Sequence, residues 1–126
     1  KCRAAGITVP IIPGLKPIST QTHIEMLPRA FSIDLPQELM NEVRKCKDNK
    51  AIYQVGIEWC TAQSKDLLVH GAPAIHYYTM GKADNIREIL KRTFDSPDNK
   101  FSQSIRHLYK NLYPDHLTLF NNPLRS

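Results

Sequence analysis

Two short apolar segments, each followed by a loop and an amphipathic helix, constrain this chain most. They lie at residues 8–19 and 73–82. A repeated strand, loop and helix is typical of parallel α/β proteins, whose strands need cover on both faces and neighbours at both edges. Two strands cannot complete such a sheet. We therefore expect the chain to be part of a larger fold.

The first six residues, Lys-Cys-Arg-Ala-Ala-Gly, support the same expectation. Basic residues followed by glycine are typical of the last turn of a helix and its C-cap. This pattern predicts a helix end at Gly6, and we expect the body of that helix and a starting Met to precede Lys1.

The length and composition favour a soluble globular chain with one modest core. The chain has 126 residues, 41% of them apolar, and no apolar run approaches the roughly 20 residues of a membrane helix. No signal segment opens the chain, so we expect a cytoplasmic protein without a membrane partner. The cysteines are odd in number and lack metal-ligand spacing, which favours buried free thiols and no metal site; they are Cys2, Cys46 and Cys60.

The formal net charge of +5 raises the question of nucleic-acid binding. Lys and Arg are distributed through every segment with acidic residues near them, as on a solvated helix surface. The strongest basic cluster, Arg106, His107 and Lys110, lacks a base-reading motif. We expect no nucleic-acid partner, and binding that did not fall steeply with added salt would remove the remaining support for one.

The first half of the chain predicts a strand and three helices. The strand covers about Val9 to Pro13, and a helix capped by Ser19 or Thr20 runs to Leu27, where Pro28 disfavours continuation. A second helix has Asp34 as N-cap, with Pro in its first turn and Gln at the capping-box position. A third runs from about residue 51 to 70 and ends at a glycine. Inward positions of these helices are Ile24, Leu27, Leu39, Met40, Val43, Cys46, Ile52, Val55, Gly56, Trp59, Cys60 and Leu67.

The second half predicts a strand at residues 74–79, a sharp turn at Gly81 and a helix at about residues 83–94. Inward positions of this helix are Ile86, Ile89, Leu90 and Phe94. A last helix is predicted over residues 101–112, followed by an irregular end. The organisation expected is a βα portion at residues 1–94 and a helical or irregular tail at residues 95–126.

Four segments together carry a resemblance to a known family. They are Ile-Ile-Pro-Gly-Leu-Lys-Pro-Ile at residues 11–18, Lys-Asp-Asn at 47–49, Gly-Ile-Glu at 56–58 and Ile-His-Tyr-Tyr-Thr at 75–79. In order, spacing and chemistry, residues 1–94 resemble the C-terminal part of methylenetetrahydrofolate reductase. The resemblance implies a (β/α)8 barrel, of which this chain would hold the end of helix 6, strand 7, a helical connection, strand 8 and helix 8, an incomplete barrel.

The resemblance also implies an activity for the intact protein. The family uses NAD(P)H to reduce bound FAD, which passes the hydride to methylenetetrahydrofolate to give methyltetrahydrofolate. The catalytic and FAD-holding residues of the family belong to earlier strands, so we expect no catalytic or cofactor-binding residue in this chain, and no activity of the chain alone.

Three positions match substrate-binding residues of the family. His23 stands where a Gln commonly bonds the substrate, and Lys82 stands where an Arg reaches it. Leu27 stands where an aromatic packs against the folate or the nicotinamide. These residues would follow the carboxyl ends of the strands, where barrel active sites lie. Each also has an ordinary structural interpretation: His23 as an exposed first-turn residue, Leu27 as a core residue and Lys82 as a surface lysine. Lysine keeps the charge of arginine but loses its bidentate geometry.

His76 and Glu58 are interpreted as structural. His76 and Tyr78 alternate with Ile75 and Tyr77, so one pair faces the barrel interior and the other the helices. We favour a buried, hydrogen-bonded His76, because the motif has no nucleophile. Glu58 has no second carboxylate at helical spacing and is interpreted as a surface residue.

Two hypotheses of different classes follow. The chain is part of a folate-pathway flavin reductase, with folate substrate bound only by the intact enzyme. Alternatively it is a small non-enzymatic module that uses its tail for self-association or partner binding. Under either hypothesis unpaired strand edges and an uncovered apolar face favour a homo-oligomer of this chain alone.

Overall fold

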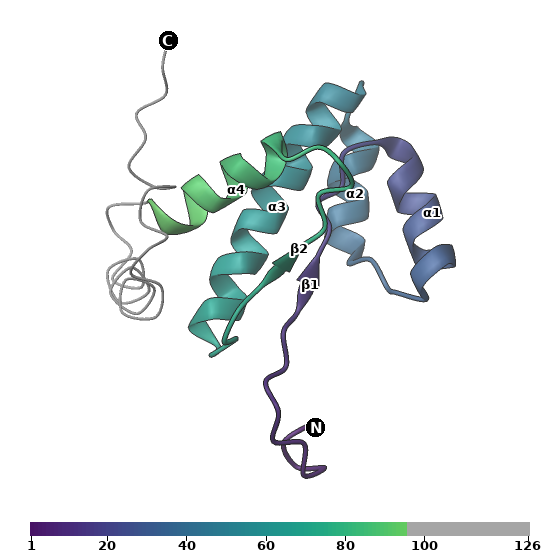
Figure 1. The fold of residues 1–126 in the computed structure, drawn as a ribbon. Coiled ribbons are helices and arrows are strands. Elements are labelled where there is room, and N and C mark those ends of the chain that lie inside the picture. Colours follow the sequence, from purple (N-terminus) through teal and green to yellow (C-terminus); the bar gives the residue numbers. More distant parts are fainter. Residues whose placement is uncertain (96–126) are drawn as a thin grey trace. The chain divides into compact units, whose positions relative to one another are not determined.

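The computed structural model describes residues 1–95, and residues 1–93 form one compact unit. The elements follow the order β1 (Gly14–Leu15), α1 (Gln21–Phe31), α2 (Gln37–Lys45), α3 (Asn49–Val69), β2 (His76–Tyr77) and α4 (Asp84–Phe94). The two strands lie side by side and parallel with α3 behind them, and α4 crosses in front of α3 (Figure 1). The helix and the irregular end predicted over residues 101–126 lie outside the described residues, as do Arg106, His107 and Lys110.

Both strands are shorter than predicted, and β1 begins later. Gly14 pairs with His76 and Leu15 with Tyr77. The His76 amide donates to the Pro13 carbonyl and the Tyr78 amide to the Leu15 carbonyl, both at 2.9 Å. Pro10 and Pro13 have no N–H to offer a ladder, so the pairing starts only after the second proline. The prediction of a strand over residues 9–13 is therefore wrong in position.

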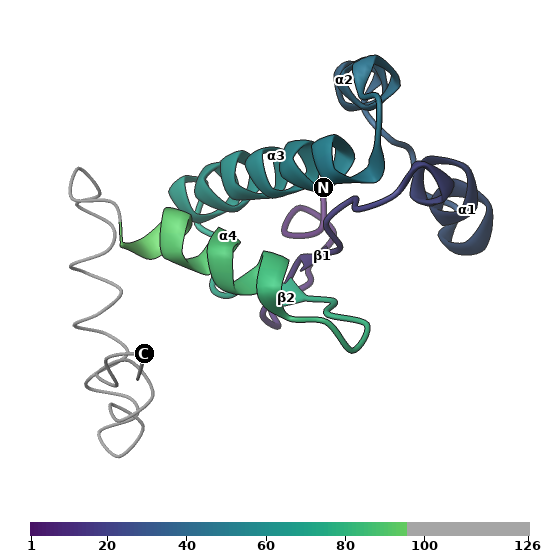
Figure 2. The same ribbon diagram turned by 90° about the horizontal axis from the view of Figure 1, so that it is seen from above.

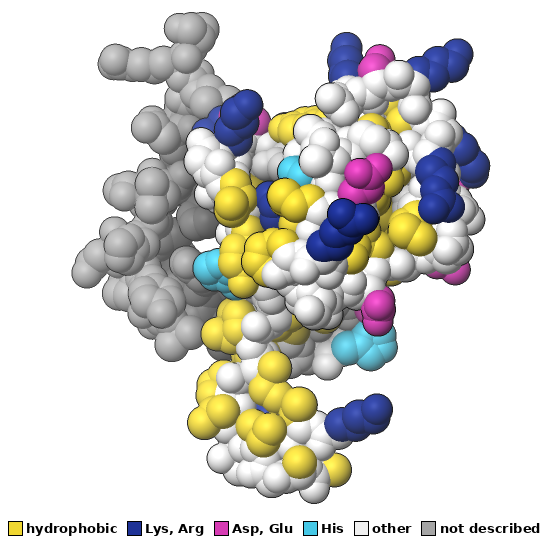
Figure 3. Space-filling model, turned by 90° about the vertical axis from the view of Figure 1, so that its right-hand side faces the viewer, with side chains coloured by type: hydrophobic (Ala, Val, Ile, Leu, Met, Phe, Trp, Pro, Cys, Tyr) yellow, Lys and Arg dark blue, Asp and Glu magenta, His cyan; other side chains and the backbone are white. Residues whose placement is uncertain are grey.

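The segment before β1 begins with the predicted helix end. The Ile7 amide donates to the Cys2 carbonyl and the Gly6 amide to the Arg3 carbonyl, both at 3.1 Å, with Gly6 at φ 81°. This is the Schellman arrangement. Arg3 Nη1 donates to the carbonyls of Ile7 at 2.7 Å and Val9 at 2.9 Å. Hydrophobic side chains are exposed on this segment, which forms the lower projection in Figure 3.

Helix α1 continues past Pro28, contrary to the prediction that it ends at Leu27. Proline costs one backbone hydrogen bond inside a helix. The buried Leu27 side chain, 3% exposed, anchors the helix at this point. The helix ends instead at Ser32, which takes a left-handed conformation at φ 50°. Thr20 occupies the N-cap but its side chain makes no capping bond.

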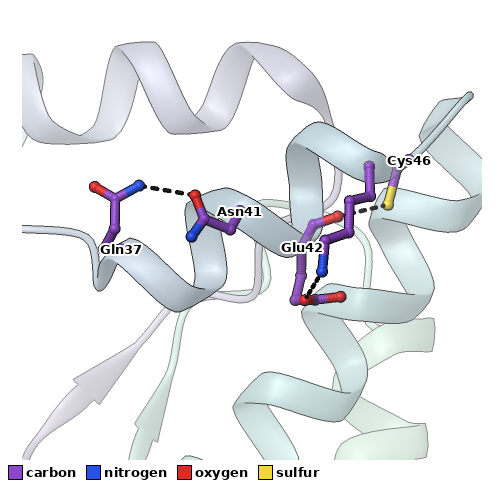
Figure 4. A network of polar contacts seen from close by, with 5 residues as sticks. Gln37, Asn41, Glu42 and Cys46 are labelled. Atoms are coloured by element: carbon purple, nitrogen blue, oxygen red, sulfur yellow. Dashed lines mark hydrogen bonds and ion pairs between the residues drawn. The ribbon is translucent and has the colours of Figure 1, made fainter.

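The predicted Asp34 cap of α2 is also wrong, because the helix has Pro36 as its N-cap and no side-chain capping bond. Residue 35 precedes a proline and is disfavoured in the helical region, which delays the start of the helix. Polar contacts follow the surface of α2 (Figure 4). Gln37 Nε2 donates to Asn41 Oδ1 at 2.9 Å, and Lys45 Nζ pairs with Glu42 at 2.6 Å.

Helix α3 begins two residues before the predicted start because Asp48 caps it, accepting a hydrogen bond from the Ala51 amide at 2.8 Å. It ends as predicted, with Gly71 at φ 84° just past the helix. Glu58 is exposed, as expected, and accepts from Gln54 Nε2 at 2.7 Å.

Two groups of buried side chains form the core. The sheet cluster joins β1 to α3 and α4 and contains Leu15, Ile57, Cys60, Ile86 and Ile89. The helical cluster joins α1, α2 and α3 and contains Ile18, Leu27, Leu39, Val43 and Ile52. On α4 the prediction included Leu90, which is 37% exposed, and missed Thr93, which is fully buried. Seen from above, α3 extends from the region of α1 and α2 to the region of α4 (Figure 2).

The three cysteines are free thiols, as expected, but only one is fully buried. Cys60 lies in the sheet cluster, and burial raises its pKa to about 11. Cys46 is half-buried and donates through Sγ to the Glu42 carbonyl at 3.3 Å (Figure 4). Cys2 is exposed, contrary to the prediction, because it lies on the exposed turn before Gly6.

Candidate functional site

The candidate site follows the carboxyl ends of the two strands. Because β1 and β2 are parallel neighbours, the segments that leave them start from the same edge of the sheet. The chain after Leu15 leads into α1, and the chain after Tyr77 leads into α4. In parallel α/β proteins, ligands bind at this edge.

The strand residues divide between the two faces of the sheet. Ile75 and Tyr77 pack toward the helices in the sheet cluster. Tyr77 Oη donates to Ser64 Oγ at 2.7 Å, and Ser64 Oγ donates to the Cys60 carbonyl at 2.6 Å. Burial raises the pKa of Tyr77, so its phenol stays a proton donor.

His76 and Tyr78 face the opposite side, together with Gly14. Their rings meet edge to face with centroids 4.6 Å apart. A Cβ at Gly14 would lie 2.7 Å from Tyr78 Cε2, so the glycine leaves room for the tyrosine ring over β1. His76 is exposed. The prediction of a buried, hydrogen-bonded His76 is wrong, because the strand alternation turns this residue away from α3 and α4.

The turn after β2 is tight and places Lys82 at its end. The Lys82 amide donates to the Thr79 carbonyl at 3.1 Å. The two central residues, Met80 at φ 50° and Gly81 at φ 83°, both have positive φ, as in a type I′ turn. Lys82 is exposed, and it forms no ion pair with the residues that the structure describes.

His23 lies in the first turn of α1 and is half-buried. The Ser19 amide donates to its Nδ1 atom at 3.2 Å. Burial lowers the pKa of His23 below its usual value, and the positive charge of Lys16 lowers it further. The imidazole is therefore neutral at pH 7.

Leu27 lies one turn after His23, but its side chain is in the helical cluster. The structure thus gives Leu27 a packing role, and ligand contact by this residue stays a prediction. Within residues 1–95 no hydrogen bond or ion pair joins His23 to Lys82; the fold brings their segments to one edge of the sheet and leaves both side chains without a direct link.

Gly56 supports the segment that leads to the candidate site, a role that sequence analysis did not identify. A Cβ at this position would lie 1.8 Å from the Ile18 carbonyl oxygen. Helix α3 therefore touches the backbone of the segment that leads from β1 to His23. The signal was a glycine inside an otherwise regular helix, which usually has a packing or functional reason.

The N-termini of α1 and α4 do not fit the phosphates of a flavin dinucleotide. A helix N-terminus that binds phosphate needs free amides and no nearby acid. The first amide of α1 donates to Asn49 Oδ1 at 3.4 Å, and α4 carries Asp84 in its first turn. In residues 1–95 there is no cluster of three or more His, Cys, Asp or Glu suited to a metal ion, and none of their helices has the length and apolarity to cross a membrane.

The parallel strands and the helices that cover them define a βα portion of a parallel α/β protein. Comparison with known proteins identifies the family. The profile described as Methylenetetrahydrofolate reductase matches residues 1–93, and the chain belongs to this family.

Three relatives illustrate the match. A Caenorhabditis elegans protein named probable methylenetetrahydrofolate reductase (NADPH) is 40% identical over 92 residues, covering 71% of this chain and 14% of the relative. Methylenetetrahydrofolate reductase (NADH) 1 of Arabidopsis thaliana is 31% identical over 105 residues, covering 82% and 18%. The protein of that same name in Zea mays is 34% identical over 105 residues, also covering 82% and 18%. The chain spans less than a fifth of the length of these relatives.

Proposed function

We propose that this chain forms the substrate-facing C-terminal βα portion of a methylenetetrahydrofolate reductase barrel. In the complete protein, a nicotinamide cofactor would reduce FAD, and the flavin would reduce methylenetetrahydrofolate to methyltetrahydrofolate. The observation that carries the proposal is the parallel pairing of β1 and β2, which brings the segments leading to His23 and Lys82 to one edge of the sheet. Family membership supports the reaction class.

Each proposed residue has a distinct chemical task. Neutral His23 offers a hydrogen bond to the substrate from a ring whose other nitrogen is already occupied. Exposed Lys82 attracts a carboxylate or phosphate oxygen as a point charge. Leu27 packs against the start of this segment from within the core.

A chimera tests this proposal. Residues 1–93 replace the matching segment of the C. elegans relative, and the rate of NADPH-dependent methylenetetrahydrofolate reduction is measured. We expect the chimera to be active. His23→Leu in the chimera should reduce kcat/KM by about tenfold or more, since one hydrogen bond to a ligand is worth about 1.4 kcal/mol. His23→Gln, which keeps a donor, should retain most of the activity.

Two results would contradict the proposal. A folded chimera without activity would show that this segment does not support the reaction. Equal kcat/KM values for His23→Leu and the unsubstituted chimera would exclude His23 from the site. The isolated 126-residue chain provides a separate test: flavin absorbance together with NADH oxidation by this chain would disprove the expectation that FAD is held elsewhere.

A further inference from the structure

The ring of His23 is held by the backbone of its own loop. The Ser19 amide lies 3.2 Å from Nδ1, and Ser19 Oγ lies 3.4 Å from the same atom. A backbone amide can only donate a hydrogen bond. Nδ1 must therefore be the unprotonated nitrogen of the ring.

A neutral imidazole carries one proton, which leaves that proton on Nε2. No residue in the described part of the chain, 1–95, bonds Nε2. The ring is thus a donor at its outer nitrogen and cannot also accept there. Among the charged side chains of residues 1–95, Lys16 acts on His23, and its positive charge favours the neutral ring.

The position of the Ser19 amide is fixed by the residues on either side of it. Ile18 is 4% exposed within the helical cluster, and its carbonyl oxygen lies where a Cβ of residue 56 would be, at 1.8 Å. On the other side, the Gln21 amide donates to Asn49 Oδ1 in the first turn of α3 at 3.4 Å. Helix α3 therefore anchors the loop that holds the ring.

We propose that Gly56 and the Ser19 amide are positioning groups that fix His23 as a hydrogen-bond donor through Nε2, so that the site selects a ligand atom that accepts a hydrogen bond. Such an atom is a carbonyl or carboxylate oxygen or an unprotonated ring nitrogen. An amide side chain at this position could donate or accept by turning over, whereas the held imidazole donates only. The inference rests on the proposed function in one respect, that His23 faces the ligand.

Nuclear magnetic resonance of the 126-residue chain, labelled with ¹⁵N at its five histidines, measures the tautomer directly. Two-bond ¹H–¹⁵N correlations at pH 7.5 should show His23 as the Nε2–H form, with the signals assigned by their loss in His23→Gln. A predominantly Nδ1–H ring, or an even mixture of the two tautomers, would overturn the proposal.

Two variants of one residue separate the amide from the hydroxyl. Ser19→Pro deletes the N–H, and Ser19→Ala keeps it while deleting Oγ. We expect Ser19→Pro to raise the titration midpoint of His23 and to mix its tautomers, and Ser19→Ala to leave both unchanged. Equal behaviour of the two variants would overturn the role of the amide. If Ser19→Pro does not fold, the tautomer of His23 in the unsubstituted chain and in Ser19→Ala decides whether the amide fixes the ring.

Gly56→Ala tests the role of α3 in the same spectra. A displaced Ile18 backbone should mix the tautomers of His23, and an unchanged Nε2–H pattern in a folded variant would remove Gly56 from the proposal.

Titration of the chimera, in which the rest of the barrel is present, with 5-methyltetrahydrofolate separates this inference from the proposed function. A shift of the His23 Nε2–H signal supports ligand contact. An unresponsive ring that remains the Nε2–H tautomer contradicts the ligand role and with it the proposed selection of an acceptor, while the positioning by Ser19 stands. A wrong tautomer contradicts the positioning whether or not the ligand binds.

Discussion

The two sides of the β1–β2 sheet use adjacent residues for opposite purposes. On the covered side, Leu15 is 7% exposed and Tyr77 reaches Ser64 through a hydrogen bond. On the open side, Tyr78 is 49% exposed and lies over a glycine, beside the exposed His76. Strand alternation separates these environments within one residue. The comparison teaches that stability should depend on the covered side, while the open side is available for association.

The largest expected effect is a change in the mass of the chain in solution, because self-association would cover the open side of the sheet. We propose that the isolated chain forms a dimer or higher oligomer, which light scattering at high concentration measures as at least a doubled mass. Ile12→Lys, at a residue 54% exposed just before the strand, should restore the monomer mass by placing charge at this edge. Glu38→Lys on α2 is the control. If the unsubstituted chain is monomeric, the open side does not drive association, and this difference between the two sides is contradicted.

Ile89→Ala on α4 should destabilise the covered side most. Ile89 is fully buried in the sheet cluster, and deleting such a side chain costs about 4 kcal/mol of unfolding free energy. The neighbouring Leu90, 37% exposed, is the matched control, and its change to Ala should stay within about 1 kcal/mol. Urea unfolding measures both, and similar losses would mean that α4 does not present Ile89 to the sheet.

Gly56→Ala should cost about 3 kcal/mol, since the added Cβ meets backbone and no rotamer change relieves the contact. Helix propensity alone predicts the opposite sign, a gain of about 1 kcal/mol. Ala62→Gly, at an exposed position of α3, measures the propensity term by itself. A stabilised Gly56→Ala chain in urea unfolding would contradict the close approach of α3 to Ile18.

Tyr77→Phe should cost about 1 kcal/mol by removing the hydrogen bond to buried Ser64. Tyr78→Phe, the same change one residue later on the open side, should stay within about 0.5 kcal/mol. Thermal or urea unfolding of the pair compares the two sides directly. A larger loss for Tyr78→Phe would reverse the assignment of the faces.

Acid should produce the smallest effect, through His23. Its pKa is lowered in the folded chain, so the unfolded chain binds more protons as the pH falls. The stability contributed by the neutral ring is complete above pH 6.5, which is the ordinary pKa of the His23 side chain. It is lost as the pH falls through the lower pKa that this side chain has in the folded chain. Unfolding between pH 7.5 and 5 measures this, and His23→Gln should flatten the dependence. An unchanged slope in that variant would assign the effect to other groups.

Sequence patterns predicted the order of the described elements and most of the core. Helical spacing identified Val43 and Ile89, both fully buried, and the Gly71 helix end. These features depend on local periodicity and backbone conformation, which neighbouring residues determine. The four motifs likewise indicate the family that the profile matches.

The errors have a different physical origin. Whether Pro28 ends α1 depends on how firmly Leu27 is anchored by other helices, and the start of β1 depends on which carbonyls β2 can reach. The closeness of Gly56 to Ile18 is likewise a contact between distant segments. For the candidate site, sequence motifs indicate His23 and Lys82, but the partner of His23 Nδ1 is the Ser19 amide, whose position depends on contacts with distant residues of α3.

Arg3 has a consequence for how the sheet could grow. Its guanidinium already occupies the Ile7 and Val9 carbonyls, two acceptors that a newly arriving strand would seek. Pro10 and Pro13 offer no donors between that point and β1. Any third strand added along this segment must therefore gain its hydrogen bonds from Ile11 and Ile12, between the prolines, and from the short stretch near Gly14. Arg3 and the two prolines limit misdirected growth of the sheet to a few residues, as charge and proline do at other natural strand edges.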